Sequence, residues 1–152
     1  MNTLTVCIFL YIYPKIFDMH PFLKSGLAVL GGIFVGAVVN FGIILMSGFV
    51  IPPPEGVDVT NVESIKANMH LYKPIHFLFP FLAHAVGTLV GAVLAVKISG
   101  NNQSKVGYIV AFVFLYGGIS MATQVPGPLW FSIVDLAFAY IPMAWLGSKL
   151  LR

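Results

Sequence analysis

The sequence predicts an all-α polytopic membrane protein, in which four transmembrane helices form a bundle with a short external amphipathic helix. Four apolar stretches, at about 26–51, 77–96, 106–123 and 129–148, are long enough, or nearly so, to cross about 30 Å of hydrocarbon at about 1.5 Å per residue. Composition agrees, because 59% hydrophobic and 9% charged residues leave too little polar surface for a soluble globule. We therefore expect a single transmembrane domain over residues 23–152, with the lipid bilayer as its main partner.

Residues 1–22 precede the first span and are expected to form an interfacial or cytoplasmic segment. The apolar stretch 6–13 ends at Pro14 and is too short to cross a bilayer. It lacks a basic n-region and a small-residue cleavage site, so a cleaved signal peptide is not expected. An alternative is that translation starts at Met19, just before the first span.

The first two spans carry small residues at every fourth position. In lipid, helices associate through close backbone contact, which small side chains permit. We therefore predict that these two helices pack face to face through these residues: Gly32, Gly36 and then Asn40 in the first span, and Ala83, Gly87, Gly91 and Ala95 in the second.

The external loop 52–76 is the largest hydrophilic segment. Three prolines from Pro52 stop the first helix, and residues 55–58 are typical of a turn. Thr60 and Glu63 have the spacing of a capping box, which predicts the start of a helix. Its apolar face would consist of Val62, Ile65, Met69 and Tyr72, at i, i+3, i+7 and i+10. Such a helix lies on the membrane surface or caps the bundle, or alternatively docks a partner.

Basic residues predict the orientation of the chain. With the N-terminus inside, six basic residues are cytoplasmic, whereas only Lys66 and Lys73 are external, beside three acidic residues. This asymmetry predicts cytoplasmic N- and C-termini in a plasma membrane, and it accounts for the net charge of +3 without a nucleic-acid partner. Trp130 and Trp145 bracket the fourth span at its two interfaces.

Polar residues inside the spans mark the candidate functional site. Asp135 lies about 8 to 9 Å below the external interface and His84 about 10 to 11 Å below it, so the two side chains could meet. A carboxylate at this depth is costly unless it is paired, protonated or hydrated. Asn40, Thr88 and Gln124 are expected to complete the cluster. Pro142 leaves the carbonyl of Phe138 without its helical partner.

This cluster has two interpretations. In the first, His84 and Asp135 line a hydrated cavity and bind or relay a proton, a cation or a small solute. In the second, they form an interhelical hydrogen bond that fastens the second span to the fourth.

Signatures of enzymes and of metal or cofactor sites are missing from the sequence. It contains no Gly-x-Ser-x-Gly, no His-Glu-x-x-His and no glycine-rich phosphate loop, so neither an enzyme nor a cofactor is expected. His70, His76 and His84 lack the i+3 or i+4 spacing of metal ligands, and no metal site is predicted. The only cysteine, Cys7, excludes an internal disulfide.

Three motifs can be compared with known families: Pro-Pro-Pro-x-Gly-x-Asp at 52–58, the glycine-rich second span, and Pro-x-Pro-Leu-Trp-Phe at 126–131. Through them, about two-thirds of the chain resembles a group of small bacterial four-span membrane proteins without an assigned activity. The resemblance implies the four-helix fold and a bacterial inner membrane, and it implies no catalytic residues.

Two functions are compatible with these features. The first is small-solute or proton-linked permeation through an oligomeric helical bundle. The second is a noncatalytic accessory or assembly subunit that docks onto a larger membrane complex through its external helix and small-residue faces.

Overall fold

The computed structural model describes residues 20–100, 104–125 and 127–151, and it confirms the all-α class. The elements in order are α2 (Pro21–Val50), α3 (Val62–Ala67), the 3₁₀ helices η1 (Met69–Leu71) and η2 (Pro74–Phe77), α4 (Leu78–Ser99), α5 (Ser104–Gln124), α6 (Leu129–Phe138) and α7 (Ile141–Leu150). Four segments are long and apolar enough to cross a membrane: Pro21–Val50, Pro74–Ser99, Ser104–Gln124 and Leu129–Leu150. The chain is therefore a multi-pass membrane protein. The predictions for residues 1–19, and the part of the predicted external hairpin at Pro126, lie outside the described residues.

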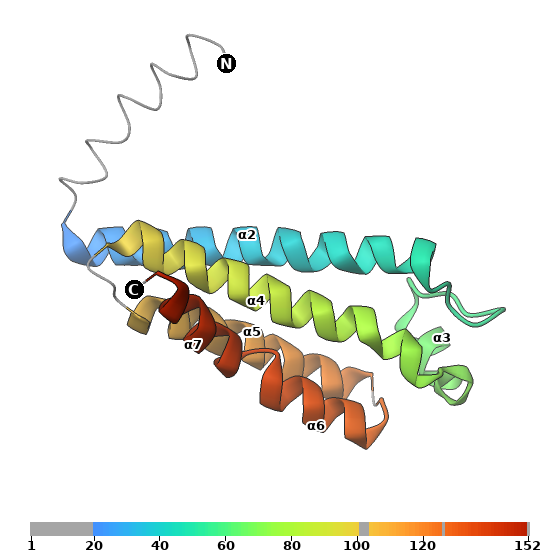
Figure 1. Cartoon of the computed structure of the whole chain (residues 1–152). Helices are drawn as coiled ribbons and strands as arrows, with labels where there is room; N and C mark the ends of the chain where they lie inside the picture. The colour runs from blue at the N-terminus through green and yellow to red at the C-terminus, as the bar shows by residue number, and fades with distance from the viewer. Residues whose placement is uncertain (1–19, 101–103, 126, 152) are drawn as a thin grey trace, which may run out of the picture.

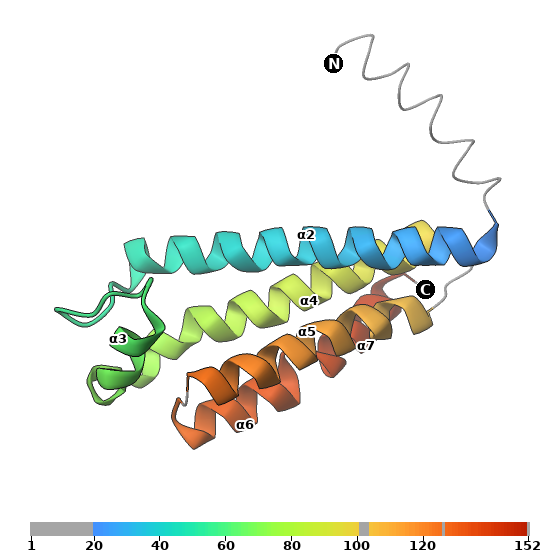
Figure 2. The same cartoon turned by 180° about the vertical axis from the view of Figure 1, so that it is seen from behind.

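Helix α4 lies at the centre of the bundle and contacts α2, α5, α6 and α7. In both views α2 lies on one side of α4, with α6 and α7 on the other (Figure 1, Figure 2). The start of α2, the end of α4, the start of α5 and the end of α7 meet at one end of the bundle (Figure 1). We call this the lysine end, since it carries Lys24, Lys97, Lys105 and Lys149. The opposite end, with residues 51–77 and the connection from α5 to α6, is the loop end.

Helices α2 and α4 pack through reciprocal glycine contacts, as the sequence predicts. A β-carbon at Gly32 would lie 2.5 Å from the Gly91 carbonyl oxygen, and one at Gly36 would lie 2.6 Å from that of Gly87. The reverse contacts are equally close, at 2.6 Å from Gly91 to the Gly32 oxygen and 2.9 Å from Gly87 to the Gly36 oxygen. No other residue permits backbones to approach this closely, so these four glycines set the distance between α2 and α4.

Helix α2 begins at Pro21 rather than near residue 26. Pro21 occupies the first turn, where its missing N–H costs nothing, and the His20 ring accepts a hydrogen bond from the Phe22 N–H at 3.3 Å. The helix ends at Val50, and its C-cap residue Ile51 directly precedes the prolines. In the second half of α2, Gly42 and Gly48 lie on an uncovered face, because a β-carbon at either would meet no atom within 4 Å.

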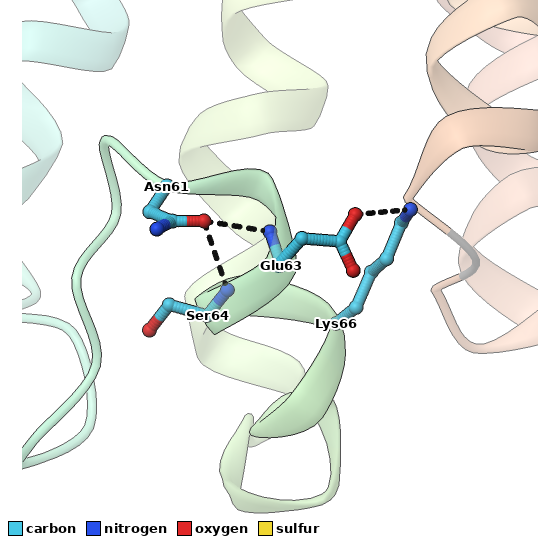
Figure 3. Close-up of polar contacts among 4 residues, drawn as sticks. All are labelled: Asn61, Glu63, Ser64 and Lys66. Carbon is cyan, nitrogen blue, oxygen red and sulfur yellow. Dashed lines mark hydrogen bonds and ion pairs between the residues drawn. The ribbon is translucent and has the colours of Figure 1, made fainter.

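The external helix is shorter than predicted and has a different cap. Asn61, not Thr60, caps α3, and its side chain accepts hydrogen bonds from the N–H groups of Glu63 (2.9 Å) and Ser64 (3.3 Å) (Figure 3). Lys66 forms an ion pair with Glu63 at 2.9 Å (Figure 3). The predicted capping box is therefore wrong, because the Thr60 hydroxyl donates instead to the Asp58 carboxylate two residues upstream, at 2.7 Å.

The predicted apolar face of this external helix is also divided. Helix α3 ends at Ala67, Met69 lies in η1, and Tyr72 follows η1 in an extended conformation. Val62, Ile65, Met69 and Tyr72 consequently do not form one helical stripe. No residue of α3 is buried.

Small residues form most of the core, and large apolar residues face outward. Three buried clusters combine alanines with a few larger side chains: Ala95, Val96, Val106 and Val110; Ala92, Ala111 and Ala144; and Ala85, Ala139 and Tyr140. In contrast, residues such as Phe22 and Phe49 are more than four-fifths exposed. This distribution suits a protein whose solvent is hydrocarbon, since apolar side chains on its surface carry no cost there.

Candidate functional site

The fourth span is interrupted in its middle. Helix α6 ends at Phe138 and α7 starts at Ile141, and Tyr140 between them has a non-helical conformation (φ −121°, ψ −79°). Pro142, in the first turn of α7, has no N–H and crowds the preceding turn, which explains the break. Ten residues of α6 at about 1.5 Å each place the break about 15 Å from the loop end, near the centre of a hydrocarbon layer of about 30 Å.

The break frees backbone polar groups at this depth. The flanking bonds run from the Ala139 N–H to the Asp135 oxygen (2.9 Å) and from the Ala144 N–H to the Tyr140 oxygen (3.1 Å). In the described part of the chain, the N–H groups of Tyr140, Ile141 and Met143 donate no backbone hydrogen bond across the break. Non-helical backbone at membrane depth occurs where it is enclosed by protein or lines a hydrated cavity. Broken helices of this kind surround binding sites in transporters.

His84 and Asp135 meet one turn above this break. The His84 Nδ1 lies 2.9 Å from Oδ1 and 2.9 Å from Oδ2 of Asp135, so helices α4 and α6 are joined by one shared contact. The Asp135 side chain is 6% exposed, whereas that of His84 is 23% exposed. The imidazole is therefore the accessible member of the pair, and the carboxylate is the enclosed member.

Tyr140 is the third member of the network. Its hydroxyl donates to Asp135 Oδ2 at 3.0 Å, and its ring centroid lies 5.7 Å from that of His84. Tyr140 is among the largest fully buried side chains of the described residues. Its hydroxyl lies against Gly118 of α5, where any β-carbon would overlap it. Gly118 therefore provides the space that lets Tyr140 reach Asp135.

Sequence reasoning missed Tyr140 and Gly118. In a continuous helix, positions 135 and 140 differ by about 140° around the axis and face different neighbours. Only the break turns Tyr140 back towards the carboxylate. The available signals were the tyrosine two residues before Pro142 and the paired Gly117 and Gly118 within an apolar span.

The structure places the remaining predicted members of the cluster in three different surroundings. Thr88 is fully buried one turn along α4 from His84, and its hydroxyl oxygen has no hydrogen-bond partner among the described residues. Asn40 is half-buried and packs its β-carbon against Gly87 at the interface of α2 and α4. Gln124 does not join the cluster, because its amide bonds to the Ser120 hydroxyl (3.0 Å) one turn earlier in α5.

The geometry is suited to proton exchange. When Asp135 is ionised, it accepts hydrogen bonds from the His84 Nδ1–H and the Tyr140 hydroxyl. When Asp135 is protonated, its own O–H can donate to Nδ1 with the same atoms in contact. One arrangement thus accommodates both protonation states of the pair.

His76 at the loop end has other partners. His76 Nδ1 accepts the Lys73 N–H at 2.8 Å, and its ring packs edge-on against Tyr72 at 5.5 Å. Within residues 20–100, 104–125 and 127–151, no group of three or more His, Cys, Asp or Glu side chains is arranged to hold a metal ion.

Comparisons with known proteins give no match: no family model, no curated protein and no solved structure is similar to the chain. The resemblance to small bacterial four-span proteins therefore stays a prediction, and function is argued from the site.

Proposed function

We propose that this protein mediates proton-linked permeation across the membrane, and that His84 and Asp135 carry the proton. The observation on which this proposal rests is the position of His84 Nδ1, 2.9 Å from both carboxylate oxygens inside the membrane spans. Intramembrane carboxylates and histidines are costly to bury, and they commonly serve in proton relays. Histidine also changes charge near neutral pH, which is the range that such a relay needs.

The proposed transfer starts at the exposed side of the imidazole. A proton binds the outer ring nitrogen, Nε2, and the Nδ1 proton passes over 2.9 Å to Asp135. The products are a neutral histidine and a neutral carboxylic acid, so no net charge is created within the pair. The Tyr140 hydroxyl stabilises the ionised carboxylate, at 3.0 Å, before the transfer.

The helix break supplies the coupling to conformation. Tyr140 is both a ligand of Asp135 and the residue at which α7 starts. Protonation of Asp135 weakens the hydrogen bond from the Tyr140 hydroxyl while the contact with His84 is kept, and this difference biases the orientation of α7 relative to α6. Linkage between a proton and a transported solute requires a structural element with two arrangements, one of which is favoured when the proton is bound.

The test is a flux assay on Asp135→Asn in proteoliposomes that contain a pH-sensitive dye. A potassium diffusion potential drives protons inward, and we expect Asp135→Asn to abolish the protein-dependent acidification. His84→Gln is expected to slow it strongly, because the amide cannot release a proton. Gln124→Leu is the matched control. It also removes a polar side chain from a span, but the Gln124 amide forms its hydrogen bond within α5.

Equal rates of acidification for wild-type protein and Asp135→Asn, with both proteins monodisperse and inserted, would refute this proposal. Loss of insertion in Asp135→Asn but not in His84→Gln would instead favour a fastening role for the pair. Measuring the rate per inserted molecule separates the two results.

We infer that the lysine end faces the cytoplasm of a bacterial inner membrane. The support is the gathering of Lys24, Lys97, Lys105 and Lys149 at one end of the bundle, which is typical of cytoplasmic faces. Single cysteines introduced into a Cys7→Ser background test this orientation. A cysteine at Lys73 should react with an impermeant maleimide in intact cells, and one at Lys97 should react only after permeabilisation.

A role as an accessory subunit is the second candidate. The observation that favours it is the uncovered face of α2 at Gly42 and Gly48, where an added β-carbon would meet no atom within 4 Å. A helix of another chain could pack there, either a second copy in an oligomeric bundle or a subunit of a larger complex. Gentle extraction from native membranes, followed by mass measurement, distinguishes a second copy from a larger complex. A larger partner in stoichiometric amount would contradict the proposal that this protein mediates permeation by itself.

A further inference from the structure

An apolar groove at the loop end is lined by η2 and the first turn of α4 on one side and by the first two turns of α6 on the other. Its volume is about 380 Å³, and its lining consists of apolar residues: Pro74, Ile75, Phe77, Leu78, Phe81, Trp130, Phe131 and Val134. The polar network described above contributes no residue to it. The groove is therefore a separate feature of the molecule.

Aromatic contacts fix the walls of this groove. Phe77 is buried and lies 5.7 Å from Trp130 and 4.8 Å from Phe131, measured between ring centroids. Tyr72 packs on Phe77 at 6.1 Å from outside, and this burial raises the pKa of its hydroxyl above the ordinary value. Because these rings hold one another, the groove is formed before anything binds.

The position of the groove within the membrane spans indicates that it is surrounded by lipid. Its residues fall within the spans Pro74–Ser99 and Leu129–Leu150, and Ile75, Leu78, Trp130 and Val134 are between 38% and 51% exposed. A surface at that place is in contact with lipid. The eight residues 74–81 extend over about 10 Å, which matches the upper part of an acyl chain.

A basic residue directly precedes the groove-lining residues in the sequence. Lys73 directly precedes Pro74 in the wall and is exposed. Glu63 of the external loop is paired with Lys66, at 2.9 Å. An ammonium group beside an apolar groove is complementary to an amphiphile with an anionic head and a hydrocarbon tail.

We propose that this groove binds one acyl chain of an anionic phospholipid, with the phosphate over Lys73. The lipid is held at a defined site and exchanges more slowly than the surrounding bilayer lipids. This site is independent of the proton network, and it would remain if the proposed permeation were wrong.

The test uses Trp130 as a reporter in the Trp145→Phe variant, which leaves Trp130 as the only tryptophan. The full-length protein in detergent micelles is titrated with phosphatidylglycerol or phosphatidylcholine that carries brominated acyl chains, and quenching is recorded. We expect saturable quenching with a lower midpoint for phosphatidylglycerol. Lys73→Gln should remove most of the difference between the two lipids.

Two double variants control for the groove itself. Leu78→Phe with Val134→Phe narrows it, and we expect the midpoint to rise about tenfold, as excluding about two methylene groups implies. Leu129→Phe with Ile133→Phe also introduces two phenylalanines, at exposed apolar positions of α6 outside the lining, and it should leave the midpoint unchanged. Quenching that rises in proportion to lipid mole fraction, without saturation and equally in all variants, would overturn the proposal.

Discussion

Two adjacent glycines of α5 should respond in opposite directions to the same substitution. A β-carbon at Gly118 would overlap the Tyr140 hydroxyl and would lie 2.7 Å from its ring carbon Cζ, whereas one at Gly117 would meet no atom within 4 Å. Gly118→Ala must therefore displace Tyr140, and with it the 3.0 Å hydrogen bond to Asp135. Gly117→Ala changes only the local helix.

The expected magnitudes follow from these contacts. Overpacking a close-packed site costs about 1 to 3 kcal/mol. Loss of a hydrogen bond within a membrane protein adds about 0.6 kcal/mol and at most about 1.7 kcal/mol. Gly118→Ala should thus lower the free energy of unfolding by about 2 to 4 kcal/mol. Gly117→Ala should leave it unchanged or raise it by up to about 1 kcal/mol, because alanine is the better helix former.

Reversible unfolding in mixed micelles, with the SDS fraction raised stepwise and helicity followed by circular dichroism, measures both values. Combining Gly118→Ala with Tyr140→Phe gives an independent check. Removing the hydroxyl relieves the closest overlap but leaves the ring carbon too near, so the double variant should be less destabilised than the sum of the singles by about 1 kcal/mol. Identical transitions for the Gly117→Ala and Gly118→Ala proteins would refute this account of the site.

Two further predictions concern the glycine interface and the external loop. Gly36→Ala should destabilise the bundle by about 1 to 3 kcal/mol in the same unfolding assay, because its β-carbon would lie 2.6 Å from a backbone oxygen of α4. Gly42→Ala, where the β-carbon meets no atom, should be neutral. Equal effects of the two substitutions would contradict the packing of α2 against α4. In the loop, the hydrogen bond from the Thr60 hydroxyl, and then that from the Thr60 N–H, hold the pKa of Asp58 below its ordinary value. A depressed carboxyl pKa means that this loop contact stabilises above the unfolded pKa of about 4 and is lost as the pH falls through the folded pKa. Thr60→Val should raise the Asp58 pKa in a carbon-13 NMR titration, Thr60→Ser should retain the low value, and an unshifted titration in Thr60→Val would contradict the assignment.

Part of the candidate site could be predicted from the sequence, and part could not. Counting residues from the interface predicts that His84 and Asp135 lie at similar depth, because rise along a helix is constant. It does not give the rotation of each helix about its axis, on which their contact depends. Gln124 illustrates the limit, since its depth is suitable but its amide bonds to Ser120 of its own helix.

The sequence by itself determined the four spans, the end at which the lysines gather and the glycine pairing of α2 with α4. These are properties of single segments: hydrophobic length, charge at helix ends and small residues repeating every four positions. Only the tertiary structure decided that Tyr140 turns back to Asp135 beside Gly118, and that the aromatic residues of α4 and α6 enclose a groove. Those contacts depend on the break at Tyr140 and on the packing of three helices, and no periodicity along one helix encodes either.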